Sequence, residues 1–379
     1  MLAFRPIFPA QNAPFSRLSH PVAPISHALI SLTQGAYLRS DGTFGDTSTE
    51  SLADSTAPIP SAASRYSGAS GSASDFAEAL LRGGSLSQPR LAEGRFSTMV
   101  RAIEPLRTVG GESNGWRLSD GKGESLGEFD WLLLCSASAA HPRWTRTFGG
   151  EPPLSRESAS LLGDTQLEAA LHALGNTPSA PVISCLMAFD ADAAAAWAAL
   201  PCATGGAGGA FAGCELEADA TISRLLVQPL PNGLTSVVLH STLDFARVHL
   251  DVYGATSAAA RVGGAATDAT REQEIMDRLR AALSARLAPK WLKEEDLASP
   301  VWGPHLHRWG AAFPQPPFMD QSLAVCAQSR IAFCGDYVAG PHAASVEGAV
   351  MAAIAGATES SKHLAAMARC PEAPAEEKE

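Results

Sequence analysis

The chain of 379 residues carries a formal net charge of −11. No basic cluster offsets this charge, which argues against a nucleic-acid-binding surface. The hydrophobic fraction of 46% and the 26 prolines are typical of a globular protein with many loops, and the length allows two domains or one composite domain. The best candidate for a membrane span, residues 182–200, is interrupted by Asp190 and Asp192, so no stretch reaches the roughly 18 apolar residues of a span. The 7 cysteines are scattered without a C-x-x-C pair, which favours a reducing compartment over a disulfide framework.

The two ends of the chain differ in composition from its centre. Residues 1–40 contain no Asp, Glu or Lys, which is typical of organellar transit peptides, but their prolines oppose an amphipathic helix. Two interpretations stay open: a transit peptide to a chloroplast or mitochondrion, or an irregular N-terminus of a cytoplasmic protein. Residues 41–74 are rich in Ser, Thr, Ala and Gly, so we expect residues 1–64 to be poorly ordered or transit-like. The end of the chain, 368–379, is expected to be a solvated acidic tail.

The first ordered elements are expected after residue 74. A capping box formed by Asp75 and Glu78 predicts a helix that ends at Gly83. Residues 96–103 are predicted to form a strand. Residues 116–118, a turn at 120–121 and a buried strand over 129–134 then indicate a β-meander that returns to a core sheet.

The middle of the chain alternates predicted strands with one long helix. Strands are expected at 182–189, 222–227 and 236–240, and Pro-Asn-Gly at 231–233 predicts a hairpin turn between the last two. The glycine-rich residues 205–209 lack the G-x-G-x-x-G spacing and are interpreted as a loop.

The helix is predicted over residues 270–287. Thr270 and Gln273 would form its N-terminal cap, and Pro289 would stop it. Its apolar stripe, at helical spacing, consists of Ile275, Leu279, Leu283 and Leu287.

Three short patterns match functional motifs only by their letters. Residues 123–127 (GESLG) fit the G-x-S-x-G hydrolase pattern, but no helix is predicted after Ser125, so a hydrolase is a remote option. The pair at 121–122 lacks the earlier glycine of a P-loop. His305 and His307 share a face only in a strand, and without a third ligand nearby we expect no metal site.

The most informative stretch lies near the end of the chain. Residues 331–334 (IAFC) predict a buried strand that delivers Gly335 and Asp336 to a Gly-Pro turn, and a helix opens near Ser345. Glycine lets a ligand approach the backbone, a carboxylate can accept a hydrogen bond from a ribose-type hydroxyl, and a helix N-terminus favours negative charge.

This arrangement resembles the C-terminal FAD-binding segment of the flavin amine oxidase superfamily. Other segments resemble the renalase-like FAD/NAD(P)-binding oxidoreductases of that superfamily, in the same order and spacing over residues 65–367. These segments are residues 65–68 (RYSG), 129–138 (FDWLLLCSAS), 237–242 (VVLHST) with His249, and 307–311 (HRWGA).

The resemblance implies an α/β fold with a Rossmann-like FAD/NAD(P)-binding domain and an inserted mixed-sheet α+β substrate domain. The FAD-binding domain would comprise 65–140 and 325–367, and the substrate domain 141–324. It implies FAD as the cofactor, a small-molecule substrate, and hydride transfer from an amine-like or dihydronicotinamide-like substrate to the flavin. The residues implied at the cofactor are Gly335, Asp336, Val346, Glu347, Gly348 and, on the adenine side, Val100. His307 and Trp309 are implied at the substrate.

The chain departs from the family in two places. The family begins with a strand, G-x-G-x-x-G and a helix whose N–H groups bind the FAD pyrophosphate, and residues 1–40 contain no such segment. The nucleotide-binding domain would therefore be incomplete at its N-terminus. The alternative function is a truncated or non-catalytic relative that keeps the fold but does not bind FAD. The second departure is residues 223–225 (SRL), which stand where the family has S-K-P.

Overall fold

The computed structural model shows a mixed α/β protein with two compact units. Unit 1 comprises residues 1–13, 95–179 and 313–379, and unit 2 comprises residues 14–94 and 180–312. The structure describes residues 2–4, 29–32, 36–46, 65–68, 81–82, 94–95, 97–107, 113–155, 159–201, 212–230, 232–255 and 257–367.

Unit 1 is built on a four-stranded sheet with a parallel pair at its centre. The strand order is β1 (Leu2–Phe4), β9 (Trp131–Leu134), β16 (Ile331–Phe333) and β15 (Val325–Cys326). β16 runs parallel to β9, whereas β1 and β15 run antiparallel to their neighbours. Every residue of β9 and β16 is buried, as expected for parallel strands covered on both faces. The predicted buried strands near 129–134 and 331–334 are confirmed.

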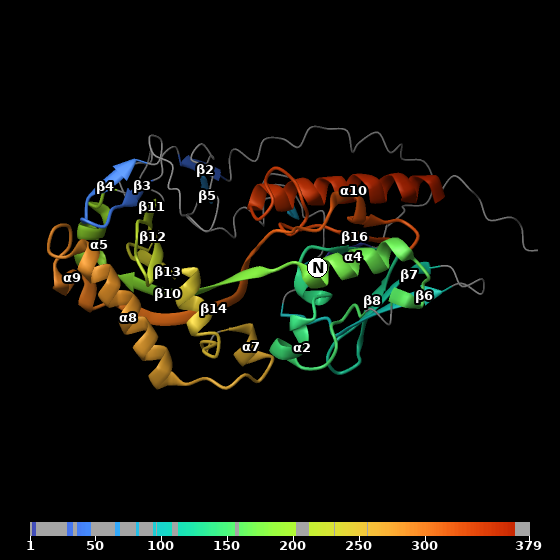
Figure 1. Cartoon of the computed structure of the whole chain (residues 1–379), viewed down its shortest axis with the longest axis horizontal. Helices are drawn as coiled ribbons and strands as arrows, with labels where there is room; N and C mark the ends of the chain where they lie inside the picture. The colour runs from blue at the N-terminus through green and yellow to red at the C-terminus, as the bar shows by residue number, and fades with distance from the viewer. Residues whose placement is uncertain are drawn as a thin grey trace, which may run out of the picture. The chain divides into compact units, whose positions relative to one another are not determined.

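Helices cover both faces of this parallel pair (Figure 1). Leu132 and Phe333 face a core that contains the apolar side of α4 (Thr165–Asn176), whereas Leu133 and Cys334 face α10 (Val346–Met367). A Cβ added at Gly356 of α10 would lie 2.6 Å from Cys334 Sγ, so the helix approaches the sheet closely there. The predicted C-terminal helix is confirmed.

A three-stranded meander is also part of unit 1. It consists of β6 (Ala102–Arg107), β7 (Ser113–Ser119) and β8 (Ser125–Phe129), paired in that order. Gly123 N donates to Asp120 O at 3.1 Å in the predicted turn. The prediction of a strand from residue 96 to 103 is wrong at its start: Ser97 has a φ of 55°, which interrupts an extended chain, and pairing begins at Ala102. The meander itself is confirmed. Unit 1 also contains η3 (Ala137–Ala139), α2 (Arg143–Phe148) and η4 (Gln321–Leu323).

Unit 2 is built on a seven-stranded sheet. Its strands, in spatial order, are β14 (Trp302–Pro314), β10 (Ser179–Phe189), β13 (Thr235–Ser241), β12 (Ile222–Pro229), β11 (Ala212–Leu216), β3 (Ala36–Leu38) and β4 (Phe44–Asp46). The central pairs are antiparallel, and the hairpin between β12 and β13 closes with Leu230 N donating to Leu234 O at 2.8 Å. The three strands predicted here and their hairpin are confirmed. A separate pair joins β2 (Leu29–Leu32) to β5 (Arg65–Gly68).

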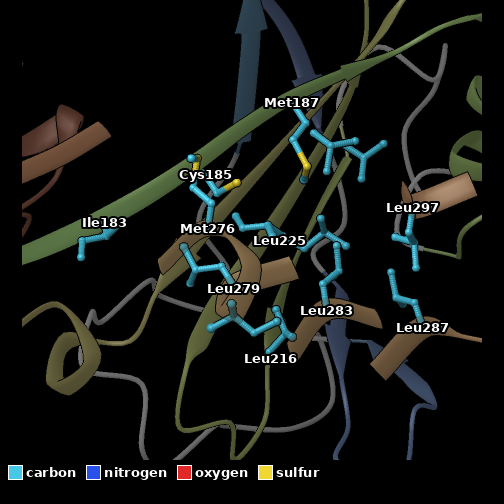
Figure 2. Close-up of a cluster of buried hydrophobic side chains, with 14 of the residues drawn as sticks. Ile183, Cys185, Met187, Leu216, Leu225, Met276, Leu279, Leu283, Leu287 and Leu297 are labelled. Atoms are coloured by element: carbon cyan, nitrogen blue, oxygen red, sulfur yellow. The ribbon is translucent and has the colours of Figure 1, made fainter. Parts of the chain in front are cut away.

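Side chains alternate strictly along β13, so the sheet has one core face and one open face. The core face packs against α8 (Ala269–Leu287), whose apolar stripe interlocks with Cys185, Met187 and Leu225 (Figure 2). All four stripe residues predicted from the sequence are buried. The other helices of unit 2 are α5 (Ala191–Ala198), α6 (Leu243–Val248), α7 (Ala258–Arg261) and α9 (Glu294–Ala298).

The N-terminal cap of α8 differs from the prediction. Asp268, not Thr270, is the capping residue, and its side chain accepts a hydrogen bond from Arg271 N at 3.0 Å. Thr270 already lies inside the first turn and is exposed. Asp268 lies two residues before Thr270, and Asp is a favoured capping residue. The helix ends before Pro289, as predicted.

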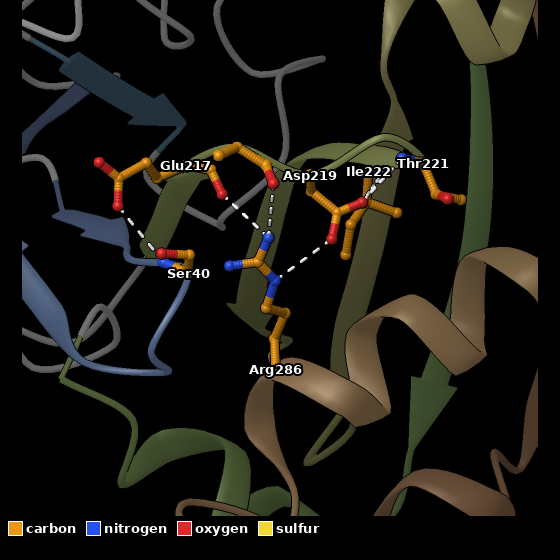
Figure 3. A network of polar contacts seen from close by, with 7 residues as sticks. Ser40, Glu217, Asp219, Thr221, Ile222 and Arg286 are labelled. Carbon is orange, nitrogen blue, oxygen red and sulfur yellow. Dashed lines mark hydrogen bonds and ion pairs between the residues drawn. The ribbon is translucent and has the colours of Figure 1, made fainter.

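The C-terminal end of α8 is tied to the turn between β11 and β12 (Figure 3). Arg286 Nε pairs with Asp219 at 3.2 Å, and its NH2 group donates to the main-chain oxygens of Glu217 and Ala218. Both partners of the ion pair are nearly buried. This network fixes the helix against the sheet edge and leaves the open face of the sheet untouched.

The compact units and the domains expected from the sequence divide the chain differently. Residues 65–94 fall in unit 2 and residues 141–179 in unit 1. The assignment of one part to a cofactor and the other to a substrate stays a prediction. The helix expected from Asp75, the loop at 205–209, most of residues 1–64 and the tail at 368–379 lie outside the described residues, although residue 81 is helical. Among the described helices, none has the length and apolarity needed to cross a membrane.

Candidate functional site

Gly335 lies directly after the carboxyl end of β16, where the chain must turn sharply. Cys334 N still donates to Leu134 O at 2.8 Å, and Val338 N donates back to Gly335 O at 3.2 Å. A Cβ at Gly335 would collide with the ring of Tyr337, whose hydroxyl donates to Leu134 O. Tyr337 is only 2% exposed. The glycine is therefore required by the packing of this turn, independently of any ligand.

The second residue of this turn, Asp336, carries a carboxylate side chain. The side chain is half-buried, and burial raises the pKa of its carboxyl, an effect that its own main-chain N–H partly opposes. No other residue of the described segments donates a hydrogen bond to this carboxylate. Its main-chain oxygen accepts from Ala344 N at 2.8 Å, which ties the turn to the residues before α10. A carboxylate in this setting can accept a hydrogen bond from a ligand hydroxyl.

The N-terminus of α10 is partly satisfied by its own loop. Ser345 Oγ accepts from Gly348 N at 3.1 Å and donates to His342 O at 2.6 Å. A Cβ at Gly348 would collide with the carbonyl oxygen of His342, so this glycine is also a packing requirement. Glu347 lies 3.5 Å from His342 Nδ1, and the side chain of Val346 is 70% exposed. The structure thus brings Gly335, Asp336 and the first turn of α10 into one segment.

Val100, implied on the adenine side, lies elsewhere in unit 1. It precedes β6, is half-buried and packs against the core that includes Ile103 and Trp116. It belongs to neither strand of the parallel pair. Its cofactor role stays a prediction.

The direction of β1 bears on whether these residues fit FAD. In doubly wound folds the pyrophosphate lies at the carboxyl ends of the parallel strands, on main-chain N–H groups at a helix N-terminus. β1 runs antiparallel to β9, whereas β16 is parallel to β9. The C-terminal end of β1 therefore points away from the end that carries Gly335.

A hollow of about 350 Å³ lies on the open face of the sheet in unit 2. It is formed by alternate residues of three adjacent strands, β10, β13 and β14. The lining residues are Ser184, Leu186, Val238, His240, Trp302, His305, His307 and Trp309. Both residues implied at the substrate, His307 and Trp309, are among them. His305 was expected to share a strand face with His307, and the two-residue period places Ser184 with Leu186 and Val238 with His240 on one face of their strands. Trp302 falls outside this period, because it lies three residues before His305.

Aromatic rings from one strand dominate this hollow. The Trp302 and His305 rings lie 4.4 Å apart between centroids, and the His307 and Trp309 rings lie 4.3 Å apart. Trp309 Nε1 donates to Ser184 Oγ at 3.2 Å, which orients the indole across β10. The arrangement offers ring faces rather than charged groups to a ligand.

Two imidazoles of the hollow, those of His240 and His307, have lowered pKa values, which favours their neutral form. Burial lowers the pKa of His240 to about 4, and the positive charge of Arg224 lowers it further. Arg224 itself pairs with Glu215 at 3.3 Å. Burial also lowers the pKa of His307. In the part of the chain that the structure describes, no three His, Cys, Asp or Glu side chains are arranged to hold a metal ion.

Neither a protein-family model nor a curated protein matches the chain. Similar solved structures include cyclohexylamine oxidase from Brevibacterium oxydans, with 15% identity, a TM-score of 0.39, and coverage of 70% of this chain and 48% of that one. A flavoprotein/dehydrogenase from Cytophaga hutchinsonii has 12% identity and a TM-score of 0.41, with 89% and 63% covered. Wild-type putrescine oxidase bound to putrescine has 12% identity and a TM-score of 0.40, with 80% and 54% covered.

The chain thus spans between 48% and 63% of the length of these three structures. At TM-scores of 0.39 to 0.41, the similarities do not decide the fold or the function of this chain.

Proposed function

We propose that the chain is an FAD-dependent oxidoreductase of the renalase/amine oxidase type, acting on an amine-like or dihydronicotinamide-like substrate. The proposal rests on the sequence resemblance over residues 65–367. The observation that carries it is the parallel pair β9–β16, which delivers Gly335 and Asp336 to the N-terminus of α10. In this proposal residues 65–140 and 325–367 form an incomplete Rossmann-like FAD/NAD(P)-binding domain, and residues 141–324 are the inserted substrate domain.

The described residues fit the flavin end of the cofactor. Asp336 would accept a hydrogen bond from a hydroxyl of the ribityl chain, because its carboxylate is half-buried and has no other donor among the described residues. The main-chain N–H groups of Val346 and Glu347 lie at the positive end of α10 and would favour negative charge on the flavin ring. When bound, FAD supplies the hydride acceptor. His307 and Trp309 would contact the substrate, since both line the hollow in unit 2.

One observation favours the alternative, a relative that keeps the fold without holding FAD. Among the described residues, β1 runs antiparallel to β9 and so does not supply the parallel strand that opens the family's strand–loop–helix unit for the pyrophosphate. The two charges of that group need several N–H donors. We therefore expect the chain to bind the flavin end of FAD more strongly than its pyrophosphate end.

Anaerobic reduction tests the proposed activity. The protein is incubated with a saturating concentration of FAD, and benzylamine or a dihydronicotinamide is added while the flavin absorbance between about 350 and 500 nm is followed. We expect one of the two reductants to bleach the protein-bound flavin faster than free FAD. Equal rates with and without the protein, for both reductants, would sink the oxidoreductase assignment.

The variant Asp336→Asn tests the site. It should weaken FAD binding by roughly 1.5–3 kcal/mol, the typical contribution of a hydrogen bond to a charged group. Glu124→Gln is the matched control, because Glu124 is an exposed carboxylate in the turn between β7 and β8. Equal FAD affinity in the two variants would count against the role of Asp336.

A further inference from the structure

Two tryptophans on one strand are exposed, although tryptophan side chains are usually mostly buried. Trp302 is 51% exposed and Trp309 is 53% exposed, and both belong to β14. Each indole packs against a histidine ring of the same strand. An exposed indole does not gain the free energy of burial. Two exposed indoles that line one hollow leave a large apolar surface in contact with solvent.

We propose that this hollow binds a flat, uncharged aromatic ring by stacking on the exposed indole of Trp309. Its volume of about 350 Å³ is at the lower end of ligand pockets, which suits a small ring system rather than a long chain. The proposal deepens the proposed function, on which it rests for the use of the bound molecule. Binding of the ring itself requires only residues of unit 2.

The polar groups of the hollow select against a charged ligand. None of its lining residues carries a carboxylate that could pair with an ammonium group. The carboxylate of Glu215 pairs with Arg224, whose positive charge acts on His240. A cation in the hollow would therefore lose hydration beside a positive charge and without a carboxylate among the lining residues.

The neutral imidazoles give the hollow its hydrogen-bonding capacity. A neutral imidazole carries one donor and one acceptor nitrogen, so it can donate a hydrogen bond to a ring substituent or accept one from it. His240 and His307 both line the hollow, from β13 and β14, which lie on either side of β10. Ser184 Oγ is oriented by Trp309 Nε1 and is therefore less free to serve a ligand. We infer that the two imidazoles bind a polar substituent of the ring, such as a carboxamide.

Calorimetric titration of the full chain without added flavin tests this proposal. The probes are benzamide, its non-aromatic analogue cyclohexanecarboxamide, and the cation benzyltrimethylammonium. We expect benzamide to bind at one site at least about tenfold more tightly than either of the others, because aromatic pairs gain energy beyond area burial. Equal binding of cyclohexanecarboxamide would overturn the stacking, tighter binding of the cation would overturn the charge assignment, and no binding of benzamide would overturn both.

Variants locate the site. Trp309→Leu should weaken benzamide binding by about three- to tenfold, and Trp309→Phe should retain most of it. Val301→Ala is the control, since Val301, the residue before β14, is 54% exposed but does not line the hollow. Unchanged affinity in Trp309→Leu, with circular dichroism like that of the parent, would overturn the proposal. If the parent protein bound benzamide but no flavin, that result would contradict the proposed function and leave the proposed ring-binding site standing.

Discussion

Gly335 and Asp336 are neighbours in the chain but differ in what the structure requires of them. The ring of Tyr337 and the nearby Cys135 carbonyl leave no room for a Cβ at Gly335, whereas nothing in the described residues besides its own main-chain N–H occupies the Asp336 carboxylate. The glycine is explained by packing alone. The carboxylate is the group at this turn that is available to accept a hydrogen bond from a ligand.

The variant Gly335→Ala should therefore destabilise the fold whether or not flavin is present. We expect a loss of about 1–3 kcal/mol in the free energy of unfolding, because the buried Tyr337 ring cannot move aside. Denaturant unfolding without flavin measures this loss. Gly121→Ala is the control: a Cβ there would meet Arg101 Cγ at 3.5 Å, an ordinary contact. Equal stability of the two variants would show that the turn is not tightly packed.

His240 should make the stability of the protein depend on pH. Its pKa falls from 6.5 to about 4 on folding, so the unfolded chain binds a proton that the folded chain does not. Stability is therefore lost as the pH falls from 6.5 towards 4. His240→Gln should reduce the loss between pH 6.5 and 4.5 by about 2 kcal/mol. Parallel losses in parent and variant, measured by denaturant unfolding, would mean that the imidazole is not held neutral.

At the scale of elements, α8 shows what a sequence pattern can and cannot predict. Its apolar stripe at helical spacing identified the helix and its buried face, because periodicity reports burial directly. The capping residue was misassigned because Asp268 and Thr270 are both acceptable caps, and only the backbone conformation at residue 268 decides between them.

This difference leads to a matched pair of variants. Asp268→Ala should lower the free energy of unfolding by about 1 kcal/mol, since Arg271 N loses its hydrogen-bond acceptor. Thr270→Ala should change it by only a few tenths of a kcal/mol, because the side chain lies exposed in the first turn. Thermal or denaturant unfolding distinguishes the two. A larger loss in the threonine variant would restore the original assignment of the cap.

The candidate sites were predictable to different degrees for a physical reason. The turn at 335–336 was recognised because its strand, turn and helix follow one another in the chain. Only two of the eight residues that line the hollow in unit 2 were predicted at the substrate, since the hollow joins β10, β13 and β14, whose register depends on pairing between distant segments. The direction of β1 could not be derived at all, because three residues carry no pattern that distinguishes parallel from antiparallel pairing.

At the scale of the whole molecule, we propose that the described residues hold the flavin end of FAD and not its pyrophosphate. The parallel pair β9–β16 and the N-terminus of α10 would hold the flavin end, whereas β1, which is antiparallel to β9, does not supply the parallel strand that precedes a pyrophosphate-binding loop. The energy of flavin binding should then come from groups that riboflavin shares with FAD. The pyrophosphate and adenosine of FAD should add little to the free energy of binding.

The most direct measurement is therefore a comparison of FAD with riboflavin, each titrated into the purified chain and followed by quenching of flavin fluorescence. We predict dissociation constants within about tenfold of one another, a difference of no more than about 1.4 kcal/mol. We also predict that Asp336→Asn weakens both ligands by the same factor, and that the protein is colourless when purified. A protein that retains FAD at one equivalent, or binds it about a thousandfold more tightly than riboflavin, would contradict the claim.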